Sequence, residues 1–154
     1  MLTETERRDI ELELTHYPDK RAACVEALKV IQRHRSWVSD ESLKDVAEVL
    51  EMTPDELDGV ATFYNLIFRK PVGRHVAFVC NSISCWIMRG DDVRERLESG
   101  LGIRLGQTTK DGRLTLLPIV CLGACDHAPV MMIDDDLHLD VTPEQADDIV
   151  RKYA

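Results

Sequence analysis

The stretch at residues 121–125 reads CLGAC and follows a largely apolar run, LTLLPIV, at 114–120. A second such run, HVAFVC at 75–80, also ends in a cysteine, and four residues separate Cys80 from Cys85. Short apolar runs bounded by turn residues predict buried strands. In an open α/β sheet, loops at the same ends of strands can lie side by side. We therefore expect the two cysteine pairs to converge at one end of a sheet.

The elements around these two strands complete an α/β domain. Apolar spacing predicts a helix over 87–97, and short apolar runs predict further strands over 130–133 and 137–141. The sequence TPEQ at 142–145 is a capping signature that opens a terminal helix. The predicted order over 71–154 is therefore β-α-β-β-β-α, an α/β sandwich without an internal repeat.

The first part of the chain has a different character. Residues 1–70 contain only one of the eight glycines and form short helical patterns separated by breakers. The sequence TPDE at 53–56 is a capping box with proline at the first helical position, and it predicts the last of these helices. The predicted fold class is α+β, with a helical domain over 1–70 and an α/β domain over 71–154.

The composition argues against several classes of function. The chain has 154 residues, and its 19 basic and 28 acidic residues give a net charge of −9. Nucleic acids and anionic membranes attract basic surfaces, so neither is an expected partner. No apolar run approaches the ~20 residues that cross a bilayer, and the N-terminus lacks the apolar segment of a secretory signal. We expect a cytoplasmic protein without direct membrane contact, in a compartment where structural disulfides are rare.

Four of the five cysteines form the pairs Cys80–Cys85 and Cys121–Cys125. Converging thiolates bind soft metals. Disulfides conflict with the expected compartment, and a thioredoxin-type dithiol needs Cys-x-x-Cys, which is absent. A structural zinc ion permits both spacings and stays an alternative. A [2Fe–2S] cluster takes two thiolates at each of its two irons, so two pairs from two loops match its stoichiometry.

Longer motifs around the cysteines carry a resemblance to a known family. They are CNSISC at 80–85, GQTTKDGR at 106–113 and CLGACDHAPVMMID at 121–134, with YPDKR at 17–21, WVS at 37–39 and VATFY at 60–64. These motifs resemble the E-subunit family of proton-pumping NADH:quinone oxidoreductase (respiratory complex I), whose members are thioredoxin-like [2Fe–2S] ferredoxins. The resemblance covers nearly the whole chain and shows no departure at a cysteine.

The resemblance implies a fold, a cofactor and partners. The fold is an N-terminal helical bundle followed by a thioredoxin-like domain that holds one [2Fe–2S] cluster at its loop tips. Cys80, Cys85, Cys121 and Cys125 are then the iron ligands. The chain is expected to dock on a flavoprotein subunit that binds FMN and NADH, beside a further iron–sulfur subunit, in the peripheral arm of a membrane-bound complex. The cluster accepts single electrons from the flavin, while this chain is not expected to bind NADH itself.

Other proteins share parts of this pattern. The small subunits of soluble NAD-linked formate dehydrogenases and hydrogenases carry the same motifs, so the sequence discriminates weakly against them. A stand-alone thioredoxin-like ferredoxin usually lacks a helical region such as residues 1–70. A zinc-stabilised interaction module without a redox role is the remaining alternative.

Residues near the cysteines are expected to tune the cluster. Gly123 and Ala124 let backbone N–H groups approach the sulfurs, and Ser82 and Ser84 add hydroxyl donors. Such hydrogen bonds raise the reduction potential. His127 is expected to be a solvated loop histidine rather than a tuning group.

Three further features have an ordinary structural interpretation. Cys24 is expected to fill the core of the helical region. The turn at 134–136 carries three aspartates and is expected to be solvated. Phe63, Tyr64 and Phe68 are expected either to anchor the flavoprotein or to pack the helical region onto the ferredoxin domain.

Overall fold

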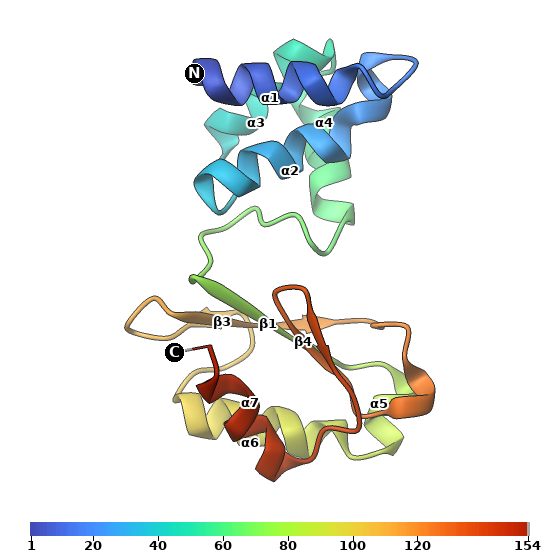
Figure 1. Ribbon diagram of the computed structural model, residues 1–154, viewed down its shortest axis with the longest axis vertical. Helices are drawn as coiled ribbons and strands as arrows, with labels where there is room; N and C mark the ends of the chain where they lie inside the picture. Colours follow the sequence, from blue (N-terminus) through green and yellow to red (C-terminus); the bar gives the residue numbers. More distant parts are fainter. Residues whose placement is uncertain (154) are drawn as a thin grey trace. The chain divides into compact units, whose positions relative to one another are not determined.

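The structure is a computed structural model, which describes residues 1–153. It divides into two compact units, of which the first covers Met1–Pro71 and the second begins at Val72. The first unit is built from α-helices, and the second combines a five-stranded sheet with helices (Figure 1). The predicted α+β fold class is confirmed. Among residues 1–153, no helix has the length and apolar character that a membrane span requires.

Four α-helices form the first unit: α1 (Glu4–Leu14), α2 (Cys24–Arg35), α3 (Asp40–Leu50) and α4 (Pro54–Phe63). The side chains of Thr3, Ser39 and Thr53 cap α1, α3 and α4, respectively, by accepting a backbone N–H of the first turn. Each cap satisfies a donor that no helical carbonyl reaches. The predicted capping box at Thr53 is present. A short 3-10 turn, Lys20–Ala23, precedes α2.

The four helices bury their apolar faces in one core, and an ion pair beside it joins α1 to α2. Glu6 is 2% exposed, and its two carboxylate oxygens lie 2.5 and 2.6 Å from the Arg35 guanidinium. Arg35 also donates to the Ser42 hydroxyl of α3 at 2.9 Å. The Arg35 hydrogen bonds lower the pKa of Glu6 from 4.5 to about 2. One charged pair therefore fastens three helices together.

The sheet of the second unit has the strand order β2-β3-β1-β4-β5. Its strands are β1 (His75–Cys80), β2 (Gln107–Thr108), β3 (Leu114–Ile119), β4 (Met131–Ile133) and β5 (Asp136–His138). The central pair, β1 and β3, is parallel, and the other pairs are antiparallel. A parallel pair needs a crossover connection, which the helices between these strands provide.

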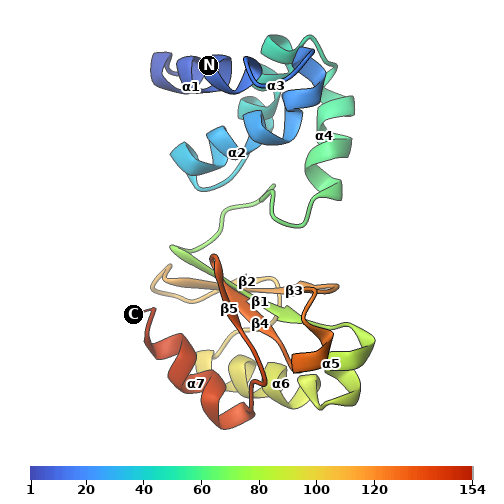
Figure 2. The same ribbon diagram turned by 45° about the vertical axis from the view of Figure 1, so that its right-hand side comes forward.

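The described part of this unit has three α-helices: α5 (Ile83–Ile87), α6 (Gly90–Leu101) and α7 (Pro143–Arg151). The two longer ones, α6 and α7, lie side by side against one face of the sheet (Figures 1 and 2). The core between them contains Ala77, Val79, Leu114, Leu116, Met131 and Ile133 from the sheet and Val93, Leu97, Ala146 and Val150 from the helices. This packing fixes the sheet from which the cysteine loops emerge.

The sequence-based prediction was wrong at two places in this unit. The range 87–97, predicted as a single helix, is divided between the end of α5 and the start of α6. Arg89, between the two helices, has a left-handed φ of +68°. A Cβ at Gly90 would lie 2.7 Å from the Cys85 carbonyl oxygen, so this sharp corner requires glycine. The prediction also missed β2. Its two residues have no apolar run, and they pair with β3 only because an intervening turn folds them back.

The aspartate turn is a structural element rather than a purely solvated one. Asp134 has a φ of +51°, and its carboxylate accepts the Val76 backbone N–H at 2.9 Å. Its other oxygen lies 2.6 Å from Nδ1 of His75. Asp134 therefore joins the β4–β5 turn to the start of β1.

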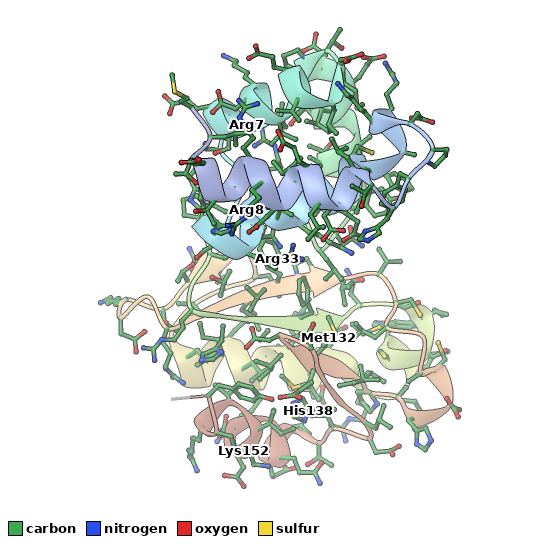
Figure 3. The ribbon with its side chains drawn as sticks, turned by 45° about the horizontal axis from the view of Figure 1, so that its top comes forward. Arg7, Arg8, Arg33, Met132, His138 and Lys152 are labelled. Atoms are coloured by element: carbon green, nitrogen blue, oxygen red, sulfur yellow. The ribbon has the colours of Figure 1, made fainter. Side chains whose placement is uncertain are left out.

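Tyr153, which lies just after α7, contacts β5. Tyr153 Oη donates to the Asp136 carboxylate at 2.6 Å and lies 3.3 Å from Nε2 of His138. Figure 3 labels His138 on β5 and Lys152 just after α7. Burial lowers the pKa of His138, and the charge on Lys152 lowers it further against the opposing effect of Asp136. These contacts fasten the residues after α7 to the edge of the sheet.

Replacing Glu6 with glutamine is expected to destabilise the helical unit by about 2 kcal/mol, because Arg35 loses its charged partner. Since folding lowers the pKa of Glu6 from 4.5 to about 2, its contribution is complete above pH 4.5 and disappears toward pH 2. Urea unfolding followed by far-ultraviolet circular dichroism measures the difference. The matched control is Glu11→Gln, an exposed position on the same helix. An E6Q difference that persists unchanged at pH 2 would contradict the role of this ion pair.

Candidate metal centre

The parallel pairing of β1 and β3 places two cysteines at the same end of the sheet. Cys80 is the last residue of β1 and stands opposite Ile119, the last residue of β3. Cys121 follows two residues after β3, and Cys125 begins a 3-10 turn that ends at His127. The sulfur atoms of Cys121 and Cys125 are 3.7 Å apart.

Cys85 lies in an α-helix, unlike the other three cysteines of the two pairs. The sequence predicts it in a loop, whereas the structure places it in the short helix α5, which is preceded by Ser82 at its N-cap. The thiol of Cys85 interacts with that of Cys80, and charge on Cys125 raises the pKa of Cys85. Charge on Cys80 likewise raises the pKa of Cys125. The structure therefore places the two predicted cysteine pairs near one another, at the same end of the sheet.

The distance between the sulfur atoms of Cys121 and Cys125 distinguishes a disulfide bond from a pair of thiolates at one metal. It is far longer than a disulfide bond of about 2.05 Å, and all five cysteines are free thiols. Metal–thiolate bonds of about 2.3 Å at a tetrahedral centre place two sulfurs about 3.8 Å apart, close to the 3.7 Å observed. The thiols stand as two pairs. Among residues 1–153, no three His, Cys, Asp or Glu side chains are grouped to hold a single metal ion.

The two pairs differ in burial. Cys80 and Cys85 are 4% and 2% exposed, whereas Cys121 and Cys125 are exposed. Burial and the neighbouring Cys80 thiol raise the pKa of Cys85 to about 11. The Cys121 thiol raises the pKa of Cys125. Close thiols oppose each other's ionisation, and a bound cation removes that penalty. The donor set therefore fits a metal that binds thiolates.

Hydrogen-bond donors surround the sulfurs. Gly123 donates its backbone N–H to Sγ of Cys121 at 3.3 Å, and the Ser84 hydroxyl interacts with Cys125 and lowers the pKa of that thiol. Both were expected from the sequence. The backbone of Val130 also interacts with Cys85 and lowers its pKa. Val130, which lies just before β4, was missed, because an apolar residue carries no sequence signal for a backbone donor.

Two other residues singled out by the sequence have structural partners. His127 is half exposed, and its Nδ1 lies 2.9 Å from the Asp140 carboxylate, which raises the pKa of His127. This agrees with a solvated loop histidine. Cys24 is partly buried against the core of the helical unit. It lies outside the group of four cysteines and fills space, as expected.

Comparison with known proteins identifies the family. A family model described as thioredoxin-like [2Fe-2S] ferredoxin matches residues 10–154. The chain belongs to this family. The predicted [2Fe–2S] cofactor and the resemblance stated above are therefore confirmed, and the thioredoxin-like fold of the second unit with them.

Two relatives of this ferredoxin are similar over nearly their whole length. The E subunit of NADH-quinone oxidoreductase from Pseudomonas aeruginosa is 51% identical over 153 residues, which are 99% of this chain and 92% of the relative. The protein of the same name from Escherichia coli K12 is 49% identical over 152 residues, again 99% of this chain and 92% of the relative.

A solved structure shares the fold at lower similarity. It is an NAD+-reducing [NiFe]-hydrogenase in the air-oxidized state, with a TM-score of 0.71 and 22% sequence identity. The match covers 85% of this ferredoxin and 22% of the hydrogenase chain. At this identity the likeness shows the fold alone.

Gly123→Ala is expected to destabilise the second unit by about 1 kcal/mol, because alanine strains at a left-handed φ. Gly123 has a φ of +81°, and a Cβ there would meet nothing within 4 Å, so the cost is conformational. Gly59→Ala is the matched control, since that glycine lies inside α4, and a Cβ there would also meet nothing within 4 Å. G59A is expected to stabilise by up to about 1 kcal/mol. Equal effects of the two substitutions in urea unfolding would contradict the conformational argument.

Proposed function

We propose that this ferredoxin is the [2Fe–2S] electron-transfer subunit of the NADH-oxidising module of proton-pumping NADH:quinone oxidoreductase. The observation that carries the proposal is 51% identity over 153 residues to a protein named as the E subunit of NADH-quinone oxidoreductase, covering 92% of that protein. The converging thiols support it. The chain then works as an electron carrier inside an oxidoreductase complex and has no NADH site of its own.

In this proposal Cys80, Cys85, Cys121 and Cys125 are the four cluster ligands, one pair for each iron. The separation of 3.7 Å between the Cys121 and Cys125 sulfurs supports binding of that pair to one tetrahedral iron. The contact of Cys85 with Cys80 supports the other pair. Four thiolates from two loops match the stoichiometry of a [2Fe–2S] centre.

The bound cluster supplies one-electron redox chemistry, while hydride oxidation takes place at FMN on a partner flavoprotein. The residues of this chain hold the cluster and set its environment. The N–H of Gly123 and the hydroxyl of Ser84 stabilise negative charge on sulfur, which raises the reduction potential. Burial of Cys80 and Cys85 opposes added negative charge. These residues therefore set the reduction potential of the cluster.

We place the flavoprotein contact on an exposed apolar surface beside the cysteines. Its large side chains are 56–67% exposed: Ile83, Trp86, Ile87, Met88 and Val120. Contiguous exposed apolar side chains mark interaction sites. These side chains lie on or next to α5, which contains Cys85, and at Val120, the residue just before Cys121. The flavoprotein is the occupant we infer, because an electron donor must approach the side of the molecule that holds the cluster.

Further partners follow from membership in such a complex. We propose that a second iron–sulfur subunit lies beside the flavoprotein, and that the assembly forms the peripheral, cytoplasmic arm of a membrane-bound enzyme. Phe63 and Tyr64 of the helical unit are 76% and 46% exposed, so they remain candidates for a second flavoprotein contact.

The purified chain is expected to be red-brown and to contain about two irons and two acid-labile sulfides. Cys121→Ser or Cys125→Ser is expected to lose or strongly perturb the cluster, because each removes a thiolate. Cys24→Ser is the matched control and is expected to keep a normal reduced-state electron paramagnetic resonance spectrum. A colourless chain with one zinc ion would refute the cofactor. A normal spectrum for both C121S and C125S would refute the ligand assignment.

A second prediction concerns the apolar surface. Trp86→Ala is expected to weaken binding to the flavoprotein by about tenfold or more, since buried aromatic residues dominate interface energies. Leu139→Ala is the control, because Leu139 is 42% exposed in the same unit but outside the surface defined above. Titration of the holoprotein with the purified flavoprotein measures both affinities. Equal affinities for W86A and wild type would refute this placement of the contact.

The alternative complexes are separated by affinity purification of the tagged chain. Copurification of a quinone-reducing membrane complex is expected. Recovery of a soluble NAD-linked hydrogenase or formate dehydrogenase instead would overturn the proposed complex, while leaving the cluster assignment intact.

A further inference from the structure

The two cysteine pairs have different surroundings, and this difference has a redox consequence. Cys80 and Cys85 are almost fully buried, at 4% and 2% exposure, whereas Cys121 and Cys125 lie open to solvent. The buried pair comes from the end of β1 and from α5. The exposed pair comes from the loop after β3.

Hydrogen bonding follows the same division. At the exposed pair, Cys121 accepts the Gly123 N–H at 3.3 Å, and Cys125 interacts with the Ser84 hydroxyl. At the buried pair, Sγ of Cys80 lies 3.7 Å from the Val120 carbonyl oxygen, which is an acceptor. A carbonyl oxygen repels a thiolate, while N–H and O–H donors stabilise it. Each sulfur of the exposed pair therefore has a donor. At the buried pair only Cys85 has one, the backbone of Val130, and the sulfur of Cys80 faces an acceptor.

Reduction adds one negative charge to the cluster and leaves one ferrous and one ferric iron. Added charge is costly in a buried apolar environment and less costly beside solvent and hydrogen-bond donors. Asp126 and Asp140 near the exposed pair oppose this preference. Their side chains are 81% and 66% exposed, so water and salt screen them. Both burial and hydrogen bonding thus favour the extra electron at the exposed pair.

We propose that Cys121 and Cys125 bind the iron that becomes ferrous, and that Cys80 and Cys85 bind the iron that stays ferric. The inference rests on the proposed ligand set. A cluster held by these residues would supply one-electron chemistry, from two ferric irons to one ferric and one ferrous iron, with the reduced flavin of the proposed partner as the electron donor. No bond forms or breaks, and no proton moves.

Single Cys→Ser variants of the full-length holoprotein test the assignment through the midpoint potential. Serine oxygen is a harder donor than thiolate and disfavours ferrous iron. C121S and C125S are therefore expected to lower the potential more than C80S and C85S do, while the control C24S leaves it unchanged. Equal shifts, or larger shifts for the buried pair, would overturn the inference. Unchanged cluster spectra for both C121S and C125S would instead refute the ligand set, and the inference with it.

A measurement on the wild-type chain covers the case in which a buried variant fails to fold. Proton nuclear magnetic resonance of the dithionite-reduced holoprotein separates cysteine β-protons at ferric iron from those at ferrous iron, because their shifts depend oppositely on temperature. The ferrous-type protons are expected to show Overhauser contacts with Gly123. Contacts of the ferrous-type protons with Trp86, which follows Cys85, would overturn the assignment and leave the [2Fe–2S] function standing.

Discussion

The parallel pairing of β1 with β3 is the constraint on which the metal centre depends. Because Cys80 stands opposite Ile119, the chain leaves both strands at the same end of the sheet. The thiols of Cys80 and Cys121, 41 positions apart in the sequence, then need only short loops to approach each other. In an antiparallel pair, the chain would leave the two strands at opposite ends of the sheet. The α6 and α7 helices stabilise this pairing by burying one face of the sheet.

Much of this arrangement could be predicted from local sequence patterns. The apolar runs that end at Cys80 and Cys121 predicted two strands with converging ends, because buried parallel strands are continuously apolar. The capping boxes at Thr53 and Thr142 predicted two helix starts, because their side-chain-to-backbone hydrogen bonds form within four consecutive residues. These features depend on neighbours in the chain, and local patterns are sufficient for them.

The missed features depend on contacts made in the folded chain, which the periodicity of the sequence does not show. Strand β2 exists because β3 offers its backbone, and neither residue of β2 carries a strand signal. The corner at Arg89 brings Gly90 close to the Cys85 carbonyl, and Cys85 lies in the short helix that precedes this corner. Val130 became a donor to Cys85 only once the tertiary fold had formed. Sequence therefore predicted that the two cysteine pairs lie near one another, but not the backbone groups beside their sulfurs.

The short helix α5 shows why cofactor and partner binding are connected in this fold. A helix of five residues is not stable by itself. On one side it buries Cys85, and on the other it exposes Ile83, Trp86 and Ile87. A metal bound through Cys85 would fix the same turn that presents the apolar side chains. Under the proposed function, cluster binding would therefore organise the proposed docking surface, and a docked flavoprotein would in turn shield the thiols that are open to solvent.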